Sequence, residues 1–295
     1  MKNFSAPINA IKKNDLLINS DYESFLREAQ LDSFDTVWNY AAGEIVKKIK
    51  DRSVIRLSFA KNNALKYYYL KRHNTEFIGI KGILKSFFGI KNLSQGLLEF
   101  NNICEFRDKQ LQTVIPVAAG EKYHHFFWVE SFLVTQDAFP YVSLETLLDK
   151  NPGFFQGDEG RQRREKLIRR LSDLARKMHQ KGFNHQDFNS THILLFYHNN
   201  PDSPEIALFD LQRVEKKFSF RFRWKIKSLA RLNYTLPEGI FDTQDRKNLL
   251  LFYKGKTHFN LIDRIEWYWI EKKTKRIQRH TEKRHNRPFT ADING

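Results

Sequence analysis

The spacing of hydrophobic and polar positions predicts strands in the first half of the chain. Residues 53–59 alternate with a period of two, and an aromatic-rich run follows at residues 67–72. Both patterns are typical of strands. Residues 42–50 precede them as a further strand-like segment, and residues 113–119 and 126–135 predict two more strands. The first half is therefore expected to form a sheet.

Helical spacing dominates the second half. Residues 161–181 carry an apolar stripe with positions three and four apart, which predicts a long amphipathic helix. Gly182 ends it, as glycine commonly does at a helix C-terminus. A short helix is predicted over residues 143–148, and the Gly- and Pro-containing residues 151–160 predict a loop. The stripe consists of Leu167, Ile168, Leu171, Leu174, Ala175 and Met178.

Two carboxylates follow this long helix in an order that indicates phosphoryl transfer. The first lies in His185-Gln186-Asp187, and the second, Asp210, comes 23 residues later between two apolar residues. Metal-assisted phosphoryl transfer needs one carboxylate beside the attacking hydroxyl and another on the metal that bridges the phosphates. His192 stands five residues after Asp187. This order is typical of the catalytic core of a protein-kinase-like enzyme.

A lysine and a glutamate complete that pattern. Lys71 lies near the end of the third predicted strand, where kinases place the lysine that binds the nucleotide phosphates. A helix predicted from Ser94 carries Glu99 and Glu105, and we expect Glu99 to pair with Lys71. Taken alone, Lys71 is one of 50 basic residues, so its position and not its type supports the assignment. Only Gly43 lies where a glycine-rich loop is expected, so that loop is either atypical or elsewhere.

With these residues in view, the chain resembles the bacterial lipopolysaccharide core kinases that phosphorylate heptose or Kdo. The resemblance implies an α+β, protein-kinase-like bilobal fold. Its N-terminal lobe is an antiparallel sheet with one helix (residues 1–135), and its C-terminal lobe is mainly helical (residues 136–295). The matching text is Tyr69-Leu70-Lys71-Arg72-His73, Leu98-Glu99-Phe100, residues 116–121, 131–135 and 176–187, Thr191-His192-Ile193-Leu194-Leu195 and Phe209-Asp210-Leu211-Gln212-Arg213.

The resemblance also implies roles for these residues, with ATP and Mg²⁺ as cofactors. Asp187 is the catalytic carboxylate, Lys71 paired to Glu99 binds the phosphates, and Asp210 binds the metal. His192 stands where protein kinases place an asparagine. It either completes the metal shell or hydrogen-bonds Asp187 or a phosphate, since Mg²⁺ prefers oxygen ligands. The basic C-terminal tail and the chain length favour heptose I over Kdo as the acceptor.

Gln186 departs from the protein-kinase pattern, in which arginine usually precedes the catalytic aspartate. In protein kinases that arginine often binds a phosphorylated activation loop. The glutamine therefore argues against a switch of that kind in this chain.

Composition and charge narrow the partners and the compartment. The chain has 295 residues, a net charge of +16 and a single cysteine, Cys104, which excludes an internal disulfide framework. Residues 1–15 contain no apolar signal-peptide core, and no stretch is long and apolar enough to span a bilayer. We therefore expect a soluble or peripheral protein on the cytoplasmic side. The resemblance implies that it is peripheral at the inner membrane, with the lipopolysaccharide core glycolipid and the anionic membrane surface as partners.

A run of basic and aromatic residues after Asp210 offers a candidate surface for such partners. Either it forms a cradle for a phosphorylated acceptor at an anionic leaflet, or it is a basic helix anchored by its aromatic residues. The run comprises Lys216, Lys217, Phe218, Phe220, Arg221, Phe222, Arg223, Trp224, Lys225, Lys227 and Arg231.

Three rival functions fit parts of the sequence. A nucleic-acid-binding module suits the basic charge, but no RNA-binding motif is found and the paired aspartate motifs stay unexplained, so we expect no nucleic acid partner. The missing glycine-rich loop would fit a pseudokinase without activity, but the presence of Lys71, Asp187 and Asp210 argues against one. A kinase that acts on a protein or a small metabolite stays open.

Overall fold

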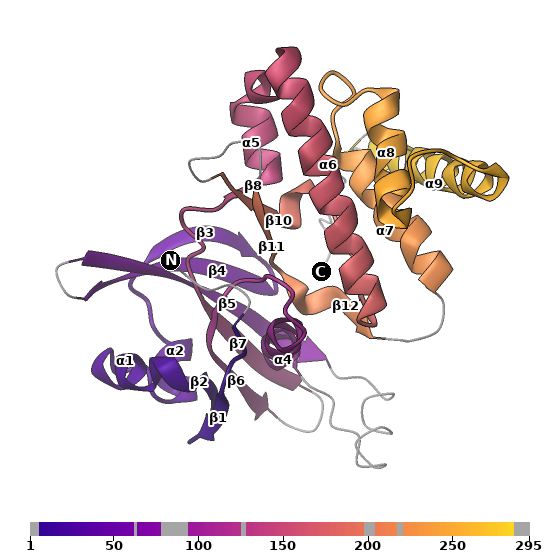
Figure 1. Cartoon of the computed structure of the whole chain (residues 1–295). Helices are drawn as coiled ribbons and strands as arrows, with labels where there is room; N and C mark the ends of the chain where they lie inside the picture. Colours follow the sequence, from indigo (N-terminus) through magenta and orange to yellow (C-terminus); the bar gives the residue numbers. More distant parts are fainter. Residues whose placement is uncertain are drawn as a thin grey trace. The chain divides into compact units, whose positions relative to one another are not determined.

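A computed structural model describes residues 6–61, 64–77, 94–124, 128–197, 204–216 and 221–285. The chain divides into two compact units (Figure 1), and each is described by itself. The first comprises Met1–Pro140 together with Ala207–Arg213. The second comprises Tyr141–Ile206 and Val214–Gly295. The predicted division at residues 135 and 136 would have placed residues 207–213 with the second unit.

The first unit is built on a seven-stranded sheet of order β1-β2-β6-β7-β5-β4-β3. All neighbouring pairs run antiparallel. Two short helices, α1 (Glu23–Glu28) and α2 (Phe34–Trp38), and one long helix, α4 (Gln95–Asp108), accompany it. The strands are β1 (Ala10–Lys13), β2 (Leu16–Asn19), β3 (Glu44–Ile49), β4 (Arg52–Lys61), β5 (Ala64–Phe77), β6 (Pro116–His124) and β7 (Trp128–Gln136).

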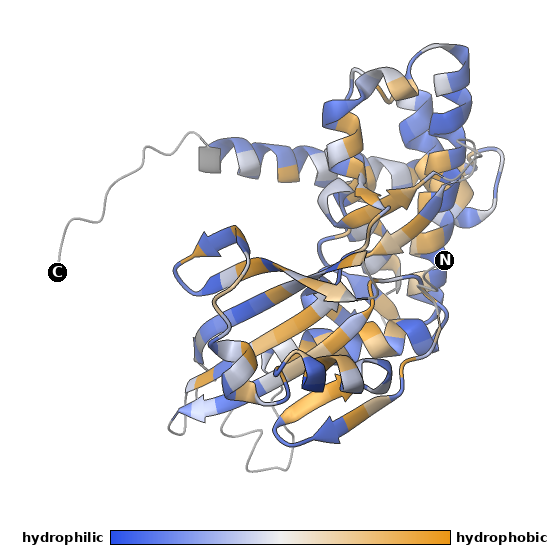
Figure 2. Cartoon of the chain, turned by 90° about the vertical axis from the view of Figure 1, so that its left-hand side faces the viewer, coloured by the Kyte–Doolittle hydropathy of each residue, from blue (hydrophilic) through white to orange (hydrophobic). Residues whose placement is uncertain are grey.

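The alternation of side chains along β4 and β5 gives the sheet two different faces, because successive residues of a strand point to opposite sides. Ile55 and Leu70 lie opposite each other and join a buried cluster with Phe25 of α1 and Phe34 of α2. Lys71, the next residue, points to the other face. Figure 2 shows the resulting alternation of hydrophobic and hydrophilic residues along the long strands.

Helix α4 covers that other face of the sheet and approaches it closely. A Cβ atom on Gly96 would lie 2.4 Å from the carbonyl oxygen of Phe132 in β7. The first turn of α4 can therefore lie this close to β7 only because Gly96 has no side chain. Phe100, Ile103 and Phe106 bury the rest of the contacting side of the helix.

The sequence pattern assigned no strand to residues 1–35, yet β1 and β2 extend the sheet at one edge. Each has only four residues, which is too short for alternation to stand out from chance. Leu16 of β2 and Phe25 of α1 are both buried.

The second unit is mainly helical, with two small sheets of order β11-β10-β8 and β12-β9. The long helix α6 packs against α7 and α8, and α7 packs against α9. The helices are α5 (Leu144–Lys150), α6 (Gly157–Gln180), α7 (Arg221–Thr235), α8 (Thr243–Lys254) and α9 (Leu261–His285). The strands are β8 (Val142–Ser143), β9 (Phe183–His185), β10 (Ile193–Phe196), β11 (Glu205–Leu208) and β12 (Val214–Lys216).

Helix α6 confirms the predicted apolar stripe, of which Leu167, Ile168 and Leu171 are fully buried. The helix nevertheless begins at Gly157, four residues before the predicted start at residue 161. The prediction of a loop over residues 151–160 was wrong there, because glycine and proline were taken as breakers. Gly160 is instead required within the first turn, where a Cβ atom would lie 2.3 Å from the carbonyl carbon of Phe155.

Candidate active-site groups

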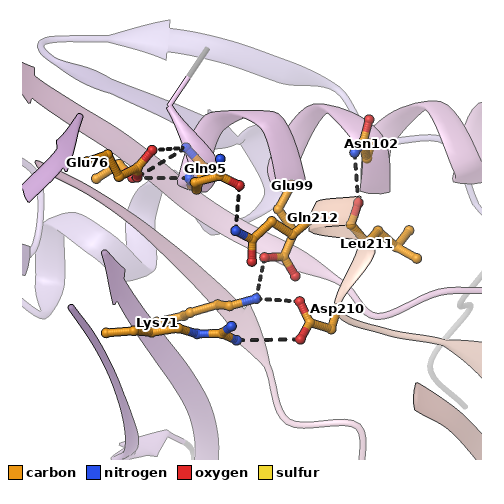
Figure 3. Close-up of polar contacts among 11 residues, drawn as sticks. Lys71, Glu76, Gln95, Glu99, Asn102, Asp210, Leu211 and Gln212 are labelled. Carbon is orange, nitrogen blue, oxygen red and sulfur yellow. Dashed lines mark hydrogen bonds and ion pairs between the residues drawn. The ribbon is translucent and has the colours of Figure 1, made fainter. Parts of the chain in front are cut away.

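Lys71 lies at the centre of a charged cluster within the first unit. It projects from β5, and its Nζ lies 2.5 Å from Glu99 Oε2 on α4 and 2.6 Å from Asp210 Oδ1 (Figure 3). The side chains of Lys71 and Glu99 are only 9% and 4% exposed. Of the two carboxylates considered on this helix, Glu99 forms the predicted ion pair.

The segment that carries Asp210 is tied to the first unit by buried hydrogen bonds. Thr113 Oγ1 donates to the Leu208 carbonyl at 2.7 Å, and Asn102 Nδ2 on α4 donates to the Leu211 carbonyl at 2.7 Å. Asp210 itself has a backbone φ of +56°, a left-handed conformation that few residues other than glycine adopt. This conformation is held between two anchored neighbours, so the carboxylate has a defined direction.

Burial and charge act on the titratable groups around Lys71. Desolvation raises the pKa of Glu99, and the positive charge of Lys71 opposes that rise. Desolvation, with Lys71 and Arg52 nearby, lowers the pKa of His73 to about 3. His73 is therefore neutral at physiological pH, and the cluster consists of Lys71 and Arg52 facing Glu99 and Asp210.

Arg52 is a member of the cluster that sequence analysis missed. It begins β4, and its Nη2 lies 3.4 Å from Asp210 Oδ2. Gly43, by contrast, lies just before β3 and not at the tip of the β3–β4 hairpin, which is formed by Lys50 and Asp51. Gly43 has a φ of +147° and lies close to the Arg56 carbonyl. Gly43 thus meets a backbone requirement, and the hairpin tip contains no glycine.

Asp187 lies in the second unit, two residues after β9. Its backbone N–H donates to Nδ1 of His185 at 3.2 Å, and its carboxylate forms an ion pair with Arg231 of α7. The Asp187 side chain is 17% exposed and that of Arg231 is 37% exposed. The carboxylate is thus oriented by a cation while part of it stays accessible.

His192 supports the same segment. Its Nδ1 donates to the backbone carbonyl of Asp187 at 3.0 Å, and its ring stacks on His185 with a centroid separation of 5.7 Å. The side chain of Asn189 accepts a hydrogen bond from the His192 backbone N–H at 3.3 Å. Among the roles considered for His192, these contacts favour one in which it positions Asp187. Its role as a metal ligand stays a prediction.

Gln186 forms a hydrogen bond with Glu215, which follows Asp210 in the sequence. Its Nε2 donates to Glu215 Oε1 at 2.7 Å, and Asn184 Nδ2 donates to the other oxygen of Glu215 at 3.1 Å. Glu215 belongs to β12, which pairs antiparallel with β9. One carboxylate therefore ties together two residues that precede Asp187.

In the basic run after Asp210, some residues pack within the unit and others are exposed. Trp224 is buried, and Lys225 pairs with Glu266 of α9 at 2.5 Å. Arg231 holds Asp187, as described above, and Arg223 and Lys227 are exposed. Lys217, Phe218, Phe220 and the side chain of Arg221 lie outside the described residues. The packing of Trp224 and Lys225 agrees with a basic helix anchored by its aromatic residues, and the cradle for a phosphorylated acceptor stays a prediction.

The residues around Asp210 fit a magnesium ion that is held mainly by a nucleotide. Mg²⁺ keeps several waters and is bound through one or two carboxylates plus substrate phosphates. Asp210 supplies one oriented carboxylate beside Lys71 and Arg52, two cations suited to phosphate oxygens. Across the described residues, no group of three or more His, Cys, Asp and Glu side chains is arranged to hold a metal alone.

Comparisons with known proteins agree with these observations. The profile of the lipopolysaccharide kinase (Kdo/WaaP) family matches residues 35–253. Lipopolysaccharide core heptose(I) kinase WaaP of Escherichia coli is 29% identical over 65% of this chain and 71% of the relative. The Pseudomonas aeruginosa protein of that name is 23% identical over 80% of this chain and 86% of the relative.

The fold also resembles a solved one. The structure of WaaP in complex with acyl carrier protein has a TM-score of 0.63 and 20% sequence identity. The match covers 86% of this chain and 97% of the other. The α+β, kinase-like fold is therefore confirmed.

Proposed function

The chain belongs to the lipopolysaccharide kinase (Kdo/WaaP) family, and we propose that it transfers the γ-phosphoryl group of ATP to heptose I of the lipopolysaccharide inner core. The observation that carries the proposal is the cluster of Lys71, Glu99 and Asp210, joined by contacts of 2.5 and 2.6 Å. A buried lysine between two carboxylates is the arrangement that kinases use to hold nucleotide phosphates. The choice of heptose I rests on the names of the WaaP relatives.

In this proposal each unit supplies a different function. Lys71, kept in place by Glu99, binds phosphate oxygens of ATP as a compact positive charge. Arg52, whose Nη2 lies 3.4 Å from Asp210 Oδ2, adds a second cation. Asp210 would hold a magnesium ion, which would neutralise negative charge on the nucleotide phosphates.

Asp187 acts on the acceptor. Its carboxylate orients the attacking sugar hydroxyl and accepts its proton as the new phosphate ester bond forms. Arg231 and His192 hold the carboxylate and its backbone in place. Because Arg231 is half-buried beside the accessible carboxylate, it also offers a positive charge for the transferred group.

The acceptor is a glycolipid, so the proposal includes a membrane. Across the described residues, no helix is long and apolar enough to cross a bilayer. We place the enzyme at the cytoplasmic face of the inner membrane as a peripheral protein. Its net charge of +16 supports attraction to an anionic leaflet.

The test uses γ-labelled ATP with purified inner-core glycolipid that lacks phosphate. We expect label on heptose I, located by NMR, with wild-type protein and none with Asp187→Asn. Asp149→Asn on α5, an exposed aspartate, is the matched control and should label as the wild type does. Label on Kdo or on protein would reject the heptose assignment, and label with the Asp187 variant would reject the assigned catalytic residue.

A further inference from the structure

Helix α9 exposes large apolar side chains along one side. Leu261, Ile262, Ile265, Tyr268 and Trp269 are each 45–74% exposed. They recur at spacings of three and four, which places them on one side of the helix. Exposed apolar patches of this kind mark interaction sites more often than chance positions.

Basic residues continue the same side over the following turns. Lys272, Arg276, Arg279 and Lys283 are exposed and keep the spacing of three and four. We call these four and the five apolar residues the α9 outer face. In Figure 1 the helix runs out past α7 and α8, the helices of the same unit.

Most carboxylates of α9 lie away from this face. Asp263 and Glu266 are buried and paired with Lys254. Glu271 precedes Lys272 by one position and so lies about 100° around the helix from it, whereas Glu282, three residues after Arg279, is a neighbour of the face. Four basic residues against this one neighbouring carboxylate leave the outer face with a net positive charge.

The aromatic and basic parts of the face are in direct contact. The Nζ of Lys272 lies 5.2 Å from the ring centre of Trp269 and 5.8 Å from that of Tyr268. These separations are within cation–π range. The positive charge thus sits at the border of the apolar patch, where it meets any surface that the patch enters.

Helix α7 widens the patch. Phe222, 51% exposed, lines a hollow with Trp269 that Arg223, Lys227 and Lys273 also border. The hollow has a volume of about 160 Å³, below the roughly 300 Å³ at which small-molecule pockets begin. A hollow this small, lined by aromatic and cationic side chains, is better suited to contact with an extended surface than to binding of a small molecule.

We propose that the α9 outer face binds the surface of an anionic lipid bilayer. A helix that lies in the plane of a bilayer interface places apolar side chains below the headgroups, Trp and Tyr at their level, and Lys and Arg against anionic lipid. The α9 outer face presents these three classes on one side. This inference deepens the proposed function, because it names the surface that would meet the membrane carrying the acceptor.

The first test measures binding to vesicles without ATP or acceptor. Wild-type protein is sedimented with phosphatidylcholine vesicles and with vesicles that also contain phosphatidylglycerol. We expect binding to the anionic vesicles to exceed that to the neutral ones, and Lys272→Gln with Arg276→Gln to lower it about thirtyfold at low salt. At about 1 M salt the two proteins should bind alike, since charges are then screened within about 3 Å.

Matched variants separate the face from general effects of charge and hydrophobicity. Ile265→Ser with Trp269→Ser should lower binding tenfold or more at any salt. Leu65→Ser on β5, where the residue is 61% exposed, should leave binding unchanged. Lys12→Gln with Lys150→Gln should also leave it unchanged, although the loss of charge equals that of the basic pair.

The second test locates the contact. Lipids brominated near the headgroup should quench tryptophan fluorescence in the wild type and in Trp128→Phe, but not in Trp269→Phe. Trp128 is 41% exposed and Trp269 45%, so the two substitutions are matched. Equal binding to neutral and anionic vesicles, or quenching that survives in Trp269→Phe, would overturn the inference, as would a partner that proved to be a soluble acidic protein in place of lipid.

The result is separable from the proposed function. Asp187→Asn should bind vesicles as the wild type does. Vesicle binding without labelled glycolipid would reject the function and keep the inference. Labelled glycolipid with no binding to anionic vesicles would reject the inference and keep the proposed function.

Discussion

Replacement of Glu99 by glutamine tests the charged cluster around Lys71. The substitution keeps the size of the side chain and an oxygen that accepts a hydrogen bond, but it removes the negative charge 2.5 Å from Lys71 Nζ. Loss of one partner from a buried ion pair costs about 3–5 kcal/mol. Asp210 stays 2.6 Å from the same Nζ, so part of the charge remains compensated. We therefore expect the free energy of unfolding to fall by about 3 kcal/mol.

The same variant should change the nucleotide site in a defined direction. Without Glu99, Lys71 is held by Asp210 alone and competes more strongly with a cation for that carboxylate. We expect the Mg²⁺ concentration for half-maximal ATP binding to rise, by tenfold or more.

Urea unfolding and ATP titrations at a series of Mg²⁺ concentrations measure the two effects. Glu105→Gln is the matched control, because Glu105 lies on the same helix and was the other candidate partner of Lys71. A loss below about 1 kcal/mol for Glu99→Gln, or an equal loss for Glu105→Gln, would refute the assigned pair.

Three further substitutions address single groups. Asp187→Ala should lower turnover by about 10³-fold or more at unchanged fold, and turnover at a tenth of the wild type would exclude this carboxylate as the catalytic one. Asp210→Asn should weaken Mg²⁺-dependent ATP binding, and equal affinity at every Mg²⁺ concentration would contradict the metal assignment. Burial lowers the pKa of His179 to about 4, so below about pH 6.5 the unfolded chain takes up a proton that the folded chain does not. His179 should contribute a fall in stability of about 1.4 kcal/mol per pH unit between pH 6.5 and 4, beside that of His73, whose pKa burial also lowers. His179→Gln should remove the share due to His179, as unfolding curves at several pH values would show.

The sequence predicts those parts of the site that depend on local order along the chain. Lys71 lies near the end of the third predicted strand, Glu99 lies on the next helix, and Asp187 and Asp210 stand in motifs with recognisable neighbours. Such positions can be inferred because the elements that carry them have recognisable periods. The same reasoning failed for β1 and β2, which have four residues each and show no period.

The cations that hold the carboxylates could not be predicted. Arg52 reaches Asp210 across 158 residues, and Arg231 reaches Asp187 across 44. Neither has a distinguishing neighbour among the 50 basic residues. Their partners are fixed by the sheet register and by the packing of α7 against α6, which spacing along the chain does not encode.

The link between Gln186 and Glu215 bears on regulation. In protein kinases an arginine at this position often binds a phosphorylated loop, which can order that loop. Here a neutral amide donates to Glu215 at 2.7 Å, and Asn184 binds the second oxygen of that carboxylate at 3.1 Å. Both bonds form within the second unit, between the paired strands β9 and β12. The segment before Asp187 is thus held by groups that the unmodified chain already contains, which argues against a phosphorylation switch at this position.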